Sequence, residues 1–140
     1  MRQLFVDTGA WLALADRDDA YHARATQALR TIVDEGTATV TSDYVLDEAV
    51  TRIRYDLGHR QAQAFLDHVS EAERSGGLNV LWVDAAAWDA AVGIFRRYRD
   101  QMLSMTDCTS FALVAHHGIA EAFAFDRHFS LFGVTLVPGM

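Results

Sequence analysis

Lysine is absent from the sequence of 140 residues, and cysteine and proline each occur once. A P-loop needs the lysine of its Gly-Lys-Ser/Thr signature, so a P-loop nucleotide site is excluded. Receiver domains and haloacid-dehalogenase-like phosphatases also rely on a lysine beside the phosphoryl group, which argues against both classes. The single cysteine, Cys108, excludes an intrachain disulfide and a cysteine-rich zinc site, and we expect it to pack in the core.

Long hydrophobic runs are missing as well. No apolar stretch approaches the ~20 residues that a membrane-spanning helix needs. The apolar residues 4–6 end at Asp7, so this segment lacks the hydrophobic core of a signal peptide. A length of 140 residues suffices for one buried core. We therefore expect a soluble cytoplasmic protein without a membrane segment, folded as a single domain over residues 1–140.

Positive charge is scarce. The formal net charge is −7, and all twelve basic residues are arginines. This balance argues against binding of nucleic acid by bulk electrostatics, because that affinity comes from basic side chains that neutralise phosphates. The argument reverses if several acids form one site, since one or two divalent ions would then cancel most of the local charge.

Short apolar runs alternate with segments of helical periodicity. Strands are predicted at residues 4–6, 37–41, 78–83, 122–125 and 134–137. Helices are predicted shortly after Asp7 and over residues 21–33, 43–56, 60–74, 85–97 and 106–117. This alternation indicates a three-layer α/β fold, with a central parallel sheet of four or five strands flanked by helices.

Four acidic residues fall at one edge of this predicted sheet. Asp7 follows the first strand and Asp126 the fourth, while Glu48 and Asp107 lie in the first turns of helices that begin at the same edge. Open α/β proteins bind their ligands at this carboxyl edge. Each acid alone has a structural explanation; Asp107, for example, follows Ser104 by three residues, as in a capping box. Independent caps and turns have no reason to share one edge, so the joint pattern favours a functional site.

The expected cluster needs a counter-ion. Two carboxylates ~4 Å apart repel by roughly 4 kcal/mol at an effective dielectric constant of 20. Sites made only of oxygen ligands select hard ions, so Mg²⁺ or Mn²⁺ is the natural occupant. Such ions polarise a phosphoryl oxygen, generate hydroxide near neutral pH and stabilise the leaving oxygen. The pattern therefore indicates phosphodiester hydrolysis. An aspartic protease would also match residues 7–10 (DTGA), but that fold is all-β, whereas residues 20–117 are mostly patterned as helix.

Several segments resemble those of PIN domains. The first acid lies in a segment similar to the opening motif of that family, and the other acids lie in segments similar to its later motifs. The matching segments are residues 6–14 (VDTGAWLAL), 18–22 (DDAYH), 41–49 (TSDYVLDEA), 104–110 (SMTDCTS) and 125–129 (FDRHF). They cover nearly the whole chain in the family's order, and a free-standing domain of this size looks most like a VapC-type toxin of a toxin–antitoxin pair.

The resemblance implies a divalent-metal-dependent endoribonuclease, using Mg²⁺ or Mn²⁺, that dimerises and is held inactive by a cognate antitoxin. Carried over by position, Asp7 and Asp107 would be the principal metal ligands. Glu48 would bind the metal directly or through water, and Asp126 would position a second ion or the attacking water. The hydroxyl of Thr8 would assist.

The sequence departs from the family pattern in two ways. Many relatives carry a second acid shortly after the fourth one, where this chain has His128, so a second metal ion stays open. The absence of lysine leaves RNA contacts to arginines, with Arg52, Arg54, Arg60, Arg96, Arg97 and Arg99 as candidates; a solvated surface role is the alternative. Two other functions also remain open: a catalytically silent binding module, and a PIN nuclease that processes RNA, or cuts DNA, without an antitoxin.

Overall fold

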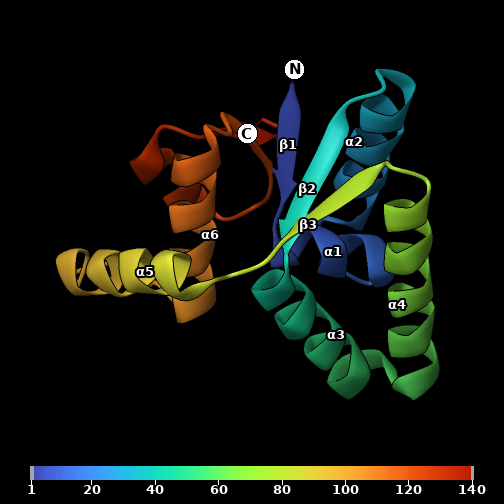
Figure 1. Cartoon of the computed structure of the whole chain (residues 1–140). Helices are drawn as coiled ribbons and strands as arrows, with labels where there is room; N and C mark the ends of the chain where they lie inside the picture. The colour runs from blue at the N-terminus through green and yellow to red at the C-terminus, as the bar shows by residue number, and fades with distance from the viewer. Residues whose placement is uncertain (1, 140) are drawn as a thin grey trace.

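The structure is a computed structural model that describes residues 2–139. Along the chain the elements are β1 (Gln3–Val6), α1 (Thr8–Ala15), α2 (His22–Asp34), β2 (Ala38–Ser42), α3 (Asp43–Leu57), α4 (His59–Arg74), β3 (Leu78–Leu81), α5 (Ala85–Arg97), α6 (Met105–His117), β4 (Glu121–Phe123), the 3₁₀ helix η1 (Arg127–Phe132) and β5 (Thr135–Val137) (Figure 1). None of the helices described is long and apolar enough to cross a membrane.

The five strands form one parallel sheet in the order β3-β2-β1-β4-β5. The central strand β1 pairs Phe5 with Val40 of β2 and with Ala122 of β4. Because all strands run the same way, their carboxyl ends share one edge, below which α3 extends in Figure 1. The expected three-layer α/β architecture with a parallel sheet is therefore confirmed.

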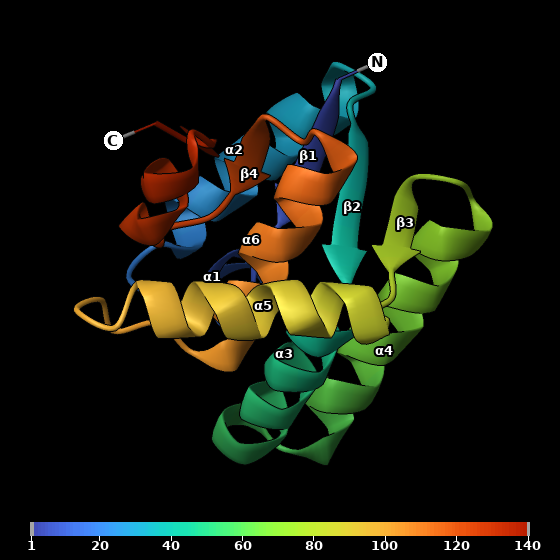
Figure 2. The ribbon, with the colours of Figure 1, turned by 60° about the vertical axis from the view of Figure 1, so that its left-hand side comes forward.

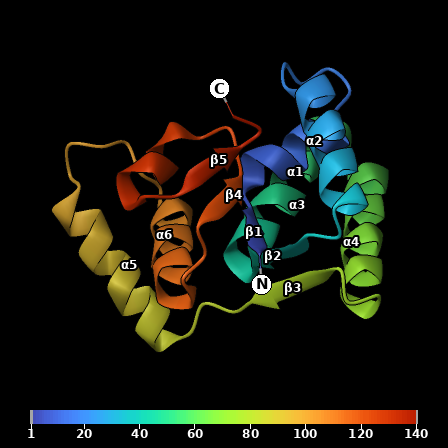
Figure 3. The same cartoon turned by 90° about the horizontal axis from the view of Figure 1, so that it is seen from above.

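Alternation along β1 divides the core into two faces. Phe5 packs with Phe111 of α6 and Phe129 of η1 on one face of the sheet. Leu4 and Val6 point to the other face, where they pack against α1 and α2. Figure 3 shows α5 and α6 on one side of the strands and α2 and α4 on the other. The period of two residues in the strand sequence thus produces a sheet that is buried on both sides.

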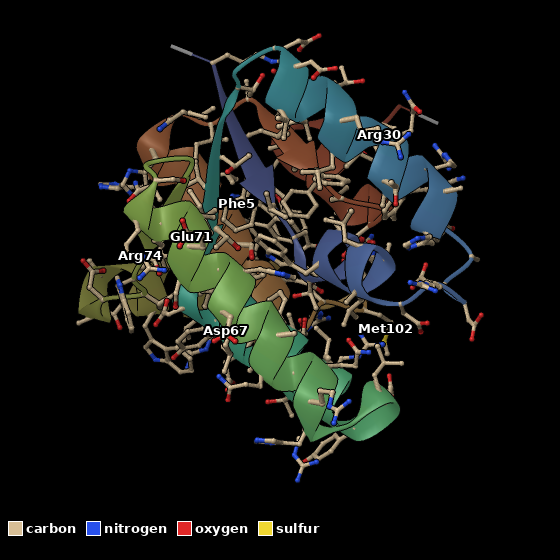
Figure 4. All side chains as sticks on the ribbon, turned by 90° about the vertical axis from the view of Figure 1, so that its right-hand side faces the viewer. Phe5, Arg30, Asp67, Glu71, Arg74 and Met102 are labelled. Carbon is tan, nitrogen blue, oxygen red and sulfur yellow. The ribbon has the colours of Figure 1, made fainter. Side chains whose placement is uncertain are left out.

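The helices present their polar residues to solvent. Arg30 on α2 and Asp67 on α4 are exposed, and Glu71 pairs with Arg74 one turn along α4. In Figure 4 these side chains lie on the outer faces of the two helices, whereas Phe5 lies inside the fold. The separation of apolar and polar faces explains how an acidic chain still builds a continuous core.

Two predicted strand ends and one connecting segment need correction. The third strand ends at Leu81 instead of residue 83, and beyond its end the backbone N–H of Val83 donates to the Asp43 carboxylate. The fourth strand ends at Phe123 instead of residue 125. The segment after Asp126 forms η1, a 3₁₀ helix that the periodicity did not predict.

Candidate active site

The backbone of Asp7 is fixed by the three central strands. Its N–H donates to the carbonyl of Phe123 at the end of β4, 3.0 Å away. The carbonyl of the preceding Val6 accepts a hydrogen bond from the hydroxyl of Thr41 in β2, at 2.9 Å. Thr41 in turn accepts from the indole N–H of Trp11 in α1. The first acid therefore stands on rigid backbone where β1, β2 and β4 end, as the topology predicted.

The carboxyl group of Asp7 is buried without a compensating cation. The residue is only 5% exposed. Burial raises the pKa of Asp7 to about 7, and the negative charges of Asp107, Asp126 and Glu48 add to the rise. A hydrogen bond from the backbone of Thr8 opposes it. Burial among like charges thus favours the protonated form of Asp7 over the carboxylate.

Asp107 has both a structural role and a place at the site. It forms the predicted capping box with Ser104, each residue accepting a 3.0 Å hydrogen bond from the other's backbone N–H. Burial raises the pKa of Asp107, and the charges of Asp126 and Glu48 raise it further, against the hydrogen bonds from Ser104. The capping bond uses Oδ2 and leaves Oδ1 without a hydrogen bond to the residues described.

Asp126 is oriented by a histidine that we did not assign to the site from the sequence. Its Oδ1 accepts from the backbone N–H of His128 at 2.9 Å and lies 2.7 Å from Nδ1 of the same residue. Both side chains remain partly exposed. The sequence does indicate this contact, because the side chain of an aspartate in a tight turn commonly accepts a hydrogen bond from the backbone N–H of the second residue after it. His128 thus positions Asp126.

Glu48 lies in the second turn of α3 and is partly exposed, whereas its neighbour Asp47 is exposed. The cap of this helix is Ser42, whose hydroxyl accepts from the backbone N–H of Val45. This hydrogen bond fixes the start of α3 at the carboxyl edge of the sheet. Glu48 is therefore held near the other three acids by the helix rather than by bonds of its own.

The four acids influence one another but do not form a finished ligand cage. The negative charges of the other three acids raise the pKa of Asp7, and those of Asp126 and Glu48 raise the pKa of Asp107. Over residues 2–139, no three His, Cys, Asp or Glu side chains stand close enough together to hold an ion as they are.

Two buried hydroxyl groups accompany the acids. In the part of the chain described, Thr8 Oγ1 and Ser110 Oγ are the buried side-chain oxygens that lack a hydrogen-bond partner. Thr8 follows Asp7 directly, and Ser110 lies one turn after Asp107 on α6. A buried hydroxyl without a partner costs about 1–3 kcal/mol. Unpaired oxygens beside uncompensated carboxylates fit a hard divalent cation and its water ligands.

The arginines chosen from the sequence are all exposed. Ion pairs within residues 2–139 involve Arg2, Arg74 and His128, and none of the six candidates. Arg96 and Arg97 end α5, and the following segment leads to the cap of α6, the helix that carries Asp107. In Figure 2, α5 crosses in front of the start of α3 and below α6. The positive end of α5 is thus joined to the helix that carries Asp107 by the segment of residues 98–104.

Cys108 is buried in the core cluster around α6, as predicted. Burial and the charge of Asp107 raise the pKa of its thiol. A raised pKa disfavours the thiolate, so the residue is suited to packing and not to nucleophilic catalysis.

Fold and site together define a class of protein: an α/β domain whose parallel sheet brings four carboxylates to its carboxyl edge. A family model described as "PIN domain" matches residues 4–134. The chain belongs to the PIN domain family.

Two known proteins are similar over nearly the whole chain. The 23S rRNA-specific endonuclease VapC20 of Mycobacterium tuberculosis (strains CDC 1551 / Oshkosh and ATCC 25618 / H37Rv) is 34% identical over 130 residues, which cover 93% of this chain and 94% of VapC20. The crystal structure of M. tuberculosis VapC20, described as a Sarcin-Ricin loop cleaving toxin, matches with a TM-score of 0.82 and 32% identity, over 94% of this chain and 96% of that chain. The structure of VapBC2 from Rickettsia felis, bound to a DNA fragment from their promoter, matches with a TM-score of 0.69 over 96% of both chains. At 12% identity, the second structure shows the shared fold alone.

Proposed function

We propose that this protein is a divalent-metal-dependent endoribonuclease, the toxin of a toxin–antitoxin pair. The observation that carries the proposal is the buried carboxyl of Asp7 in the field of Asp107, Asp126 and Glu48. Such an arrangement is unfavourable by itself and becomes favourable when a cation is bound. The 34% identity to an endonuclease over 93% of the chain supports the same function.

Asp7, Glu48, Asp107 and Asp126 would hold the Mg²⁺ or Mn²⁺ ion. When bound, the ion would polarise a phosphoryl oxygen and favour hydroxide near neutral pH. The protein's own contribution is to fix the donors. Asp7 is fixed by three strands, Asp107 by its capping box and Asp126 by His128. Burial raises the pKa of Asp7, and the carboxyl must lose its proton before it can bind a cation, so metal-dependent activity should fall as the pH is lowered.

The substrate we propose is 23S ribosomal RNA at the sarcin–ricin loop, by analogy with VapC20. This substrate places the protein in the cytoplasm. The exposed Arg96 and Arg97 would contact phosphates near the scissile bond. We further propose a homodimer that is inhibited by a cognate antitoxin. The fold of this chain is shared with a structure of VapBC2, which is consistent with a partner of this kind.

The test incubates the purified chain, shown to be folded and free of antitoxin, with ribosomal RNA and Mg²⁺ or Mn²⁺. Primer extension then maps the cut ends. We expect a discrete cut in 23S rRNA that disappears with EDTA. Cutting at another RNA would revise the substrate and keep the enzyme class. Absence of any metal-dependent cleavage would contradict the proposal and favour a silent binding module.

A further inference from the structure

An aromatic pair lies at the same edge of the sheet as the acids. Tyr21, which precedes α2, stacks on Phe125 with ring centroids 4.4 Å apart and an interplanar angle of 11°. Phe125 directly precedes Asp126 in the chain. Helix α2 leads back to the start of β2, so its first residue stands at the carboxyl edge, where β4 also ends. The pair is therefore a neighbour of the acid site.

Arg24 extends this aromatic surface. Its guanidinium lies 5.9 Å from the ring centroid of Tyr21 and 5.8 Å from that of Phe125. Its Nη2 donates to the carbonyl of Gly139 at 2.9 Å, which holds the group in place. A guanidinium over aromatic rings combines positive charge with a flat stacking surface.

The pair is also rigid and accessible. The backbone N–H of Tyr21 donates to Asp19 at 2.8 Å, and His22 Nδ1 lies 2.7 Å from the carbonyl of Ala13 in α1. Phe125 covers one face of the Tyr21 ring, yet Tyr21 remains 42% exposed. An accessible ring on a fixed backbone loses little conformational entropy when a flat ligand stacks on it.

The charges around the pair narrow the choice of ligand. The preceding loop carries three aspartates, at residues 16, 18 and 19, against one arginine, Arg17. A phosphate would be repelled by these carboxylates, whereas the uncharged face of a base would not. Proteins that bind unpaired RNA stack its bases on aromatic rings and on arginine planes.

We propose that Tyr21, Phe125 and Arg24 form a platform on which an unpaired base of the RNA stacks beside the cleavage site. The platform rests on the proposed function, because it takes RNA as the ligand. It selects single-stranded or looped RNA, since a base within a duplex cannot reach the ring. Tyr21 and Arg24 thus act in substrate binding, separately from the four acids.

The test measures binding by the full chain carrying Asp107→Asn, so that the RNA stays intact. The probe is a hairpin RNA with the sarcin–ricin loop sequence, in which 2-aminopurine replaces single loop bases in turn. We expect protein binding to quench the emission of one of these bases. Tyr21→Leu, which keeps an apolar cover on Phe125, should abolish that quenching and raise the Kd about 5- to 150-fold, the loss of one base–aromatic stack.

Two controls make the result specific. Tyr21→Phe keeps the stacking surface and should keep both the quenching and the Kd. Tyr55→Ala removes a tyrosine that is 81% exposed on α3 and should also leave both unchanged. Unchanged quenching and affinity in folded Tyr21→Leu would overturn the platform, even if the unmodified chain cuts RNA. Failure of the unmodified chain to cut RNA would instead refute the proposed function. The binding assay would still show whether Tyr21 stacks on a base.

Discussion

Replacing Asp7 with asparagine should change how the stability of the metal-free protein depends on pH. The folded-state pKa of Asp7 is raised from 3.8 to about 7. The folded protein therefore keeps a proton that the unfolded chain releases between about pH 4 and pH 7. Unfolding becomes more favourable as the pH rises through this window, and the lost stability does not return above it. Each pKa unit corresponds to about 1.4 kcal/mol, so the ionised carboxyl of Asp7 destabilises the fold by about 4 kcal/mol.

Asparagine has nearly the same shape as aspartate but does not titrate. At pH 4 the two side chains are both neutral in the folded protein, and the variant should have a stability within about 1–3 kcal/mol of the unmodified protein, the cost of an unpaired amide. At pH 8 the variant should have gained about 4 kcal/mol relative to the unmodified protein. The decisive quantity is the change, from pH 4 to pH 8, in the difference in unfolding free energy between the variant and the unmodified protein. The cost of the amide is the same at both pH values and does not affect this change.

Urea denaturation in EDTA, followed by circular dichroism at a series of pH values, measures this shift. Asp47→Asn is the matched control, since Asp47 is an exposed acid one position from Glu48. The control should run parallel to the unmodified protein. A stability difference between Asp7→Asn and the unmodified protein that stays constant from pH 4 to pH 8 would refute the argument that Asp7 is buried among uncompensated charges.

Further predictions concern the metal, the supporting hydrogen bonds and the RNA. Saturating Mn²⁺ should raise the melting temperature of the unmodified protein more at pH 8 than at pH 5, because protons compete for the acids; an equal rise at both pH values would contradict the site. Thr41→Val should destabilise the fold by about 2 kcal/mol in urea titrations, because it leaves Trp11 Nε1 and a β1 carbonyl unpaired; no loss would show that neither bond matters. Ser110→Ala removes a buried hydroxyl without a partner and should stabilise the metal-free fold by about 1 kcal/mol; a loss of stability would reveal a partner such as buried water. Replacing Arg96 and Arg97 by Ala should weaken RNA binding and flatten its dependence on salt, and unchanged values would exclude both as phosphate contacts.

The position of the acids could be predicted because it depends on topology. A short apolar run that ends at Asp7 and a helix that follows the second strand from residue 43 are both predicted by local sequence patterns. Parallel strands then bring the two segments to one edge, whatever the details of packing. The capping box of Ser104 and Asp107 is likewise a local pattern, and the structure shows it.

Contacts between distant residues could not be predicted in this way. The hydrogen bond beyond the end of β3 joins Val83 to Asp43, which are distant in the sequence. The stack of Tyr21 on Phe125 joins the start of α2 to the end of β4, and neither residue belongs to a periodic pattern that predicts the contact. The pair of His128 and Asp126 is local, yet a histidine after an aspartate is compatible with many turns. Such features require the relative placement of elements, which periodicity leaves open.

The most direct test of the account is cleavage of 23S rRNA by five variants, each changed at one acid and compared in Mn²⁺. Asp7→Asn, Glu48→Gln, Asp107→Asn and Asp126→Asn each remove one proposed metal ligand, and Asp47→Asn serves as the control. We predict that the four variants lose most of the metal-dependent cleavage while remaining folded, and that the control cuts like the unmodified protein. Cleavage that persists in Asp7→Asn and Asp107→Asn, or that resists EDTA, would contradict the claim that these carboxylates hold the catalytic metal.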